Sequence, residues 1–219
     1  VNGLTVDYAP ANDDHDAFAV VIDNAMDFEL KNSEITLNGS SLYDNYEYAM
    51  KIMGATNGLI EENIIRANLP ILDVDYSKNG GQPGLDTDLV LTVGVQESND
   101  IDFIGNTFIA HVIDRNGDYA TLDCMMIENS NNINIIGNTF NETDFFTQEG
   151  ENNYLNVLDM YYTINVLVQG NKISVETTGG SENAGTSYPI QLTGPCENVI
   201  IDGNDLYSNC AGPALGIYS

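Results

Sequence analysis

A repeated Gly-Asn pair is the feature of this sequence that most constrains its fold. The pentapeptide IGNTF occurs twice, and EENII, QGNKI, DGNDL and KNSEI are looser copies of it. The shared position, called the anchor below, is occupied by Ser33, Asn63, Asn106, Asn138, Asn171 and Asn204. Successive anchors lie 30, 43, 32, 33 and 33 residues apart. A fixed period of this length is typical of solenoid proteins.

Apolar residues alternate with polar ones around each anchor. Ile101, Phe103 and Phe108 flank Asn106 in this way, which indicates one strand entering a tight turn at the anchor and another leaving it. A further strand precedes each unit, with the inward pairs Val20/Ile22, Met50/Ile52, Val93/Val95, Met125/Ile127, Leu158/Met160 and Ile190/Leu192. Three strands per repeat without helical periodicity predict an all-β parallel β-helix, a solenoid of about six to seven coils of ~33 residues.

Stacking of the coils gives the anchors a physical role. Equivalent residues of a β-helix lie ~4.8 Å apart in columns. A sharp corner needs a left-handed backbone, and we expect the anchor Asn to adopt it, with its amide bonded along the column. A second column is Asn or Asp in all six copies: Asp27, Asn57, Asp100, Asn132, Asn165 and Asn198.

The strand–Gly-Asn–strand pattern resembles the right-handed parallel β-helix repeats of the pectate-lyase-like superfamily. This acidic, Asn-rich version is most similar to the adhesin-like surface proteins of methanogenic archaea. The resemblance covers the whole chain and implies a right-handed solenoid on the cell surface. It specifies a fold and no reaction, because lyases, hydrolases, epimerases and non-catalytic adhesins share this architecture.

The chain is expected to form a single domain, residues 1–219, with one loop insertion at 73–88. The start, VNGLTV, has the pattern of the end of a coil, and the final GPALGIYS that of the first strand of another. We therefore expect a segment of a longer solenoid.

The charge balance excludes two classes of partner. Asp plus Glu number 33, Lys plus Arg number 6, and the net charge is −27. Nucleic acid and anionic membranes need basic residues to neutralise their phosphates, so neither is expected to bind. No apolar run is long enough to insert this segment into a bilayer.

Catalytic motifs of the superfamily's enzymes are absent. We expect Ala49, Lys51, Thr92, Gly94, Cys124, Met126, Val157 and Asp159 to be among the outward positions of the first strands, and they include no Arg and only two ionisable groups. The polygalacturonase-like set of motifs is missing as well, and His15 and His111 are interpreted as ordinary surface residues. The alternative is a polysaccharide lyase or glycoside hydrolase that uses loop carboxylates such as Asp86, Asp114, Asp118 and Asp123.

A Ca²⁺ site is predicted in the insertion. Asp73, Asp75, Ser77 and Asn79 alternate as oxygen donors before Gly-Gly, and Asp86 could close the site, with Asp118 nearby in the next coil. Lys78 stands where an EF-hand has its Gly, so the match is partial. If these loops stack, their carboxylates either splay apart in solvent or hold a cation.

Tyrosines accompany the acidic residues in the loops between coils. Tyr43, Tyr76, Tyr119 and Tyr154 are predicted to bind a ligand, and Tyr46, Tyr48 and Tyr188 belong to the same group of exposed-looking loop residues. About half of these tyrosines are expected to cap the ends of the core instead. Tyr offers an apolar face with a polar tip, which suits sugar rings and protein contacts. The sequence thus favours a non-enzymatic, extracellular adhesin-like module for a glycan or cell-surface protein, with carbohydrate-active enzyme as the alternative.

Overall fold

The computed structural model describes residues 1–10, 17–39, 47–69, 72–73, 88–116, 121–146, 154–178, 186–209 and 215–218. Every element in these ranges is a β-strand, and every strand pairing is parallel. The strands stack as a β-solenoid, so the predicted fold class is confirmed. Within the described part of the chain, no helix is long and apolar enough to cross a bilayer.

Three sheets run along the solenoid, one for each strand of the repeat. The first sheet contains β2 (Ala17–Asp23), β5 (Glu47–Met53), β9 (Asp88–Gln96), β12 (Thr121–Glu128), β15 (Tyr154–Tyr161), β18 (Thr186–Thr193) and β21 (Leu215–Tyr218). The second contains β3 (Met26–Lys31), β6 (Thr56–Glu61), β10 (Asn99–Ile104), β13 (Asn131–Ile136), β16 (Ile164–Gln169) and β19 (Glu197–Asp202). The third contains β1 (Thr5–Tyr8), β4 (Glu34–Asn38), β7 (Ile64–Leu69), β11 (Thr107–Asn116), β14 (Thr139–Phe146), β17 (Lys172–Thr178) and β20 (Asp205–Ser208), with β8 (Leu72–Asp73) beside β11.

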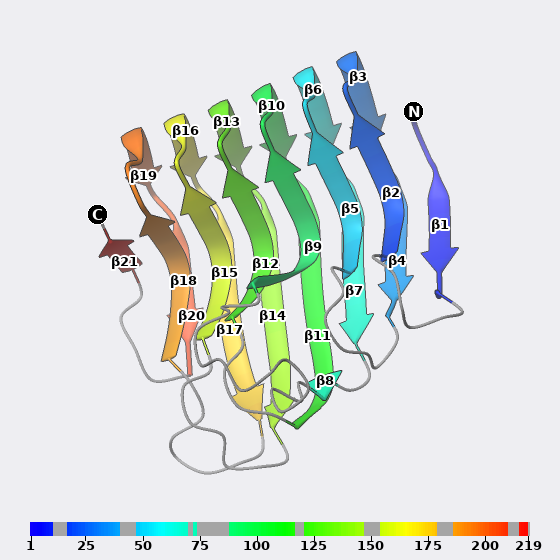
Figure 1. Cartoon of the computed structure of the whole chain (residues 1–219), viewed down its shortest axis with the longest axis vertical. Helices are drawn as coiled ribbons and strands as arrows, with labels where there is room; N and C mark the ends of the chain where they lie inside the picture. The colour runs from blue at the N-terminus through cyan, green and yellow to red at the C-terminus, as the bar shows by residue number, and fades with distance from the viewer. Residues whose placement is uncertain are drawn as a thin grey trace, which may run out of the picture.

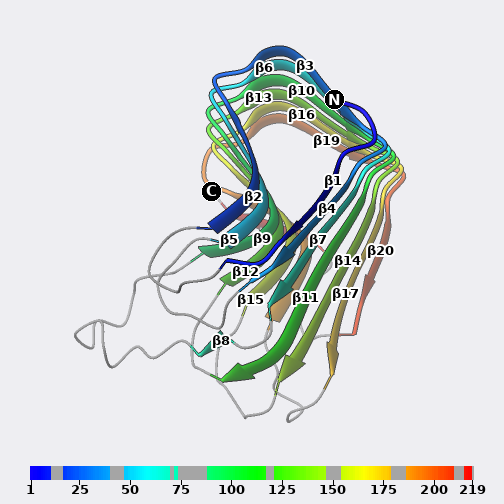
Figure 2. The ribbon, with the colours of Figure 1, turned by 90° about the vertical axis from the view of Figure 1, so that its right-hand side faces the viewer.

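Successive coils lie side by side from the N-terminal end to the C-terminal end of the solenoid (Figure 1). Viewed along the stack, the three sheets surround a common interior (Figure 2). β1 pairs with β4, and β21 pairs with β18. The terminal segments therefore have the strand identities expected from VNGLTV and GPALGIYS.

The interior is built from the alternating positions that the repeat predicts. The inward pairs from Met50/Ile52 to Ile190/Leu192 are all buried, and Phe108 stacks on Phe140 of the next coil with ring centroids 4.7 Å apart. Val20 and Ile22, in the first coil, are half-buried. One interior position has no side chain: a Cβ on Gly58 would lie 2.2 Å from Cζ of Phe28, whose ring fills that space.

The anchor residues form the expected hydrogen-bonded column. Asn138 Oδ1 accepts from the backbone N–H of Asn106 at 2.8 Å and from Asn106 Nδ2 at 3.0 Å. Asn138 Nδ2 donates to the Phe103 carbonyl at 2.9 Å and to Asn171 Oδ1 at 3.1 Å. The same pattern links Asn63 to Asn106 and Asn171 to Asn204. Buried amides are thus satisfied from coil to coil.

The left-handed residue at this corner is the Gly and not the Asn, so that expectation was wrong. Gly105, Gly137, Gly170 and Gly203 have φ between 61° and 64°, whereas the anchors are absent from the residues with positive φ. Asn32 and Glu62 take the place of the Gly in the looser copies. In the second column, all six Asn and Asp residues have φ between 52° and 58°, the left-handed conformation that these two residue types tolerate at a corner.

Candidate functional site

A bend in the first sheet decides which of its side chains face outward. Cys124 and Met125 both pack in the core, as do Ala49 with Met50 and Val157 with Leu158. The inward–outward alternation is interrupted by these two consecutive inward residues and then resumes one residue out of step. The register between β12 and β9 also shifts here, between Asp123 and Met125, as at a β-bulge. We call this interruption the bulge. The expected outward placement of Ala49, Cys124 and Val157 was therefore wrong. Thr92 is likewise buried, with its hydroxyl bonded to the Cys124 carbonyl.

The bulge creates three outward columns, which together form the outer face of the first sheet. Side chains three residues apart now share this face, because Asn156 Nδ2 donates to Asp159 Oδ2 at 3.3 Å. Strand register then gives the described members of the columns: Phe18, Tyr48, Asp123, Asn156 and Tyr188; Val21, Lys51, Gly94, Met126, Asp159 and Gln191; Asp23, Met53, Gln96, Glu128, Tyr161 and Thr193.

The middle of the outer face carries a buried polar cluster. Asp123 and Asn156 are register partners on β12 and β15, and with Asp159 they are 0% exposed. Oδ1 of Asn156 has no hydrogen-bond partner within the described part of the chain. Burying two carboxylates and an amide is costly unless the amide is hydrogen-bonded and the charge of the carboxylates is compensated. Such clusters are more frequent at functional sites than in structural cores.

Cys124 does not supply a nucleophile to this face. Its thiol points into the core, where burial raises its pKa well above the usual range and the negative charge of Glu142 adds to the effect. Glu142 itself lies on β14 and is 1% exposed. A thiol with a raised pKa stays protonated at neutral pH, and the protonated form is a poor nucleophile.

An apolar row crosses the outer face towards its N-terminal coils. Tyr48 and Met126 form a cluster against which Phe18 and Tyr161 pack. The ring of Tyr48 reaches across Gly94, where an added Cβ would lie 2.6 Å from Cε1. Nζ of Lys51 lies 5.1 Å from the centroid of Phe18 and 5.7 Å from that of Tyr48, within reach of a cation–π contact.

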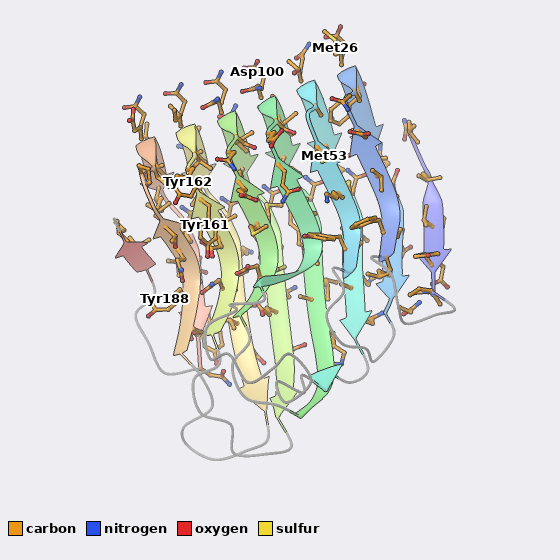
Figure 3. The ribbon with its side chains drawn as sticks, in the orientation of Figure 1. Met26, Met53, Asp100, Tyr161, Tyr162 and Tyr188 are labelled. Carbon is orange, nitrogen blue, oxygen red and sulfur yellow. The ribbon has the colours of Figure 1, made fainter. Side chains whose placement is uncertain are left out.

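The apolar row ends at Tyr161, which is followed directly by a second tyrosine, Tyr162. Tyr161 is half-buried in the third column, and Tyr162 occupies the turn that follows, with φ 50° and 52% of its surface exposed. Its ring lies against Gly194 of the next coil, where an added Cβ would be 3.1 Å from Cε1 and 3.2 Å from Cζ. Figure 3 places Tyr161 and Tyr162 together near the end of β15. We define Tyr161, Tyr162, Gln191, Thr193 and Gly194 as the tyrosine margin.

The predicted binding and metal residues fall largely outside the described residues. This holds for Tyr43, Tyr76, Tyr119, Asp75, Ser77, Asn79, Asp86 and Asp118. Tyr154 begins β15 and Asp73 ends β8, but their side chains are not among those described. The described His, Cys, Asp and Glu residues form no group of three or more suited to a metal ion.

Two of the tyrosines singled out from the sequence are buried, in keeping with the expectation that some of them cap the core. Tyr48 is 2% exposed and Tyr188 is 9% exposed. Both lie in the first outward column, next to the bulge, where the sheet bends towards its own outer face. His111 is half-buried on the third sheet, with Nδ1 2.6 Å from Thr143 Oγ1, as an ordinary surface residue would be.

Sequence reasoning did not single out Tyr161, Tyr162 or Asn156. A signal was present for the tyrosines: YYT occupies the turn where other coils have Asn24, Gly54, Glu97 or Asn129. Asn156 carried no such signal, because its placement depends on the bulge.

Comparisons with known proteins give a remote likeness among solved structures. The sequence matches no protein-family model and no curated protein. Among solved structures, the Streptococcus pneumoniae surface protein and adhesin PfbA is similar over 96% of this chain and 84% of its own, with 8% identity and a TM-score of 0.30.

Proposed function

We propose that this chain is a non-enzymatic, extracellular surface module of the adhesin type that binds glycans at the tyrosine margin. The observation that carries the proposal is the ring of Tyr162. It is half-exposed, it rests on the backbone of Gly194, and its residue has a positive φ. The positive φ belongs to the turn itself, because Asn24, Gly54, Glu97, Asn129 and Gly194 share it at this position. What distinguishes Tyr162 is the large, open ring that it places there.

The chemistry of the margin suits a sugar. A ring seated on glycine has little freedom to lose, and its open face can stack on the C–H groups of a pyranose. Thr193 is the register partner of Tyr161, Gln191 is that of Asp159, and the Gln191 amide donates to Thr193 Oγ1 at 2.9 Å. Amide and hydroxyl groups of this kind exchange hydrogen bonds readily with sugar hydroxyls.

The test is a panel of immobilised polysaccharides, with titration calorimetry of each one that binds. Tyr162→Ala should weaken binding about tenfold, because it removes the stacking platform. Tyr207→Ala is the matched control, since Tyr207 lies on β20 of the third sheet and is 53% exposed. Equal losses in both variants, or a loss in neither, would contradict the proposed site, and a panel without any binding would contradict glycan recognition.

A second candidate function follows from the buried polar cluster. Asp123 and Asp159 lie on adjacent coils and are linked through Asn156, and a pair of carboxylates is what a glycosidase requires. The same panel should therefore be assayed for new reducing ends and for unsaturated products, with Ca²⁺ present. Product release that is lost in Asp159→Asn but retained in Tyr207→Ala would establish the enzyme and displace the binding module.

The Ca²⁺ loop of the insertion remains a prediction. Asp73, Asp75, Ser77 and Asn79 would supply oxygen ligands, with Asp86 and Asp118 completing the set. Calorimetric titration with CaCl₂ should give saturable heat and a higher melting temperature, both reduced in Asp75→Asn. A flat titration together with an unchanged melting temperature would exclude the site.

A further inference from the structure

The third outward column brings a fixed negative charge to the tyrosine margin. Glu128 on β12 is the register partner of Tyr161, which in turn is paired with Thr193. Register partners on neighbouring parallel strands lie about 5 Å apart. A ligand stacked on the tyrosines would therefore lie within one coil of the Glu128 carboxylate.

Both oxygens of this carboxylate are held by neutral amides. Gln96 Nε2 donates to Oε2 at 3.0 Å, and Asn129 Nδ2 donates to Oε1 at 3.1 Å. Amide donors orient a carboxylate and leave its charge in place. The ion pairs of the described residues join Lys31 to Glu29 and Glu61, and Arg66 to Glu34, so none of them neutralises Glu128.

We infer that Glu128 determines specificity at the tyrosine margin, so that the site accepts uncharged glycans and rejects acidic ones. This inference rests on the proposed glycan-binding function. Glu128 is half-exposed, so its field reaches the bound sugar. Its remaining lone pairs can accept hydrogen bonds from the hydroxyl groups of a neutral sugar. A uronate carboxylate at the same place brings two negative charges together and has no cation to separate them.

The experiment compares matched hexasaccharides that differ only in charge. Cellohexaose is paired with its C6-oxidised form, and hexagalacturonate is paired with its carboxyl-reduced form. Binding to the native chain is measured by calorimetry at ~20 mM and ~500 mM NaCl. We expect the neutral member of a binding pair to be favoured by about fivefold or more at low salt, with a smaller difference at high salt.

Glu128→Gln is the decisive variant, because it retains the shape of the side chain and removes the charge. It should bring the acidic hexamer to within about twofold of the neutral one. Glu176→Gln removes one charge from an exposed position on β17 of the third sheet and should leave the preference unchanged.

The remaining outcomes distinguish failure of the specificity inference from failure of the proposed function. Binding of the acidic hexamer as tightly as the neutral one by the native chain would overturn the specificity inference and leave glycan binding intact. An equal shift in Glu128→Gln and Glu176→Gln would also overturn it, since net charge would then explain the preference. Absence of binding by all four hexamers would remove the proposed function itself.

Discussion

An anchor Asn satisfies several buried hydrogen-bonding groups from a single position. Oδ1 of Asn138 accepts two hydrogen bonds from the preceding coil, and its Nδ2 donates to the Phe103 carbonyl of that coil and to the next anchor, Asn171. Gln is too long for this geometry, and Asp lacks the donors. The Gly before the anchor supplies the left-handed backbone conformation of the corner, and the Asn supplies its hydrogen bonds.

Asn138→Ala should lower the free energy of unfolding by about 2–5 kcal/mol. The variant leaves the N–H and Nδ2 of Asn106 and the carbonyl of Phe103 buried without their partner. Urea denaturation followed by circular dichroism measures the loss. Asn204→Ala is the control: Asn204 is half-buried, water can replace it, and the loss should be clearly smaller.

At the scale of elements, period-two alternation predicted the strands well and their outward faces less well. Pairs such as Met125 and Ile127 were placed correctly, because an apolar core selects inward residues directly. The bulge before them could not be read from alternation, since Cys124 and Met125 both face inward. Asp123 and Asn156 therefore share a face with Asp159, a placement that depends on backbone geometry and not on residue type.

The site proposed at Tyr162 was not predicted from the sequence, for a related reason. Candidate residues were sought in the loops between coils, where acidic residues and tyrosines are frequent. Tyr162 instead lies in a tight turn between β15 and β16, and its exposure depends on the Gly at 194 of the next coil. Contacts between positions about one repeat apart become visible only after the register of the coils is known.

Gly58→Ala tests how tightly an element of the second sheet is packed. The new methyl group would meet the ring of Phe28, and overpacking should cost about 1–3 kcal/mol. Combining it with Phe28→Leu should recover part of that loss, because the smaller side chain vacates the space. Thermal denaturation of the four members of this double-mutant cycle gives the coupling energy. Strictly additive effects would show that the Phe28 ring does not determine whether position 58 accepts a side chain.

At the scale of the whole molecule, the excess of acidic residues is the main electrostatic influence on stability. The 33 acidic residues are opposed by 6 basic ones, which leaves a net charge of −27, so self-repulsion lowers the stability of the folded state. The pairing of Lys31 with both Glu29 and Glu61 shows how the few cations are shared.

Raising NaCl from ~20 mM to ~300 mM should therefore raise the melting temperature by several degrees, with about 2–4 °C for each kcal/mol of repulsion removed. Differential scanning calorimetry provides the measurement. The rise should level off once screening is complete, which distinguishes it from a salting-out effect that keeps growing. A melting temperature that falls with salt would mean that attractive ion pairs outweigh the repulsion.

The column of anchors also bears on how such a chain can change its length. Asn bonds to Asn across successive boundaries from Asn63 to Asn204, so the contact between neighbouring coils is nearly the same at each boundary. A coil copied or lost by recombination would meet a compatible neighbour on either side. Duplication or deletion in the gene can thus lengthen or shorten the solenoid one coil at a time without redesign of the flanking coils. The tyrosine margin, which the described residues contain once, would be kept or lost as a unit.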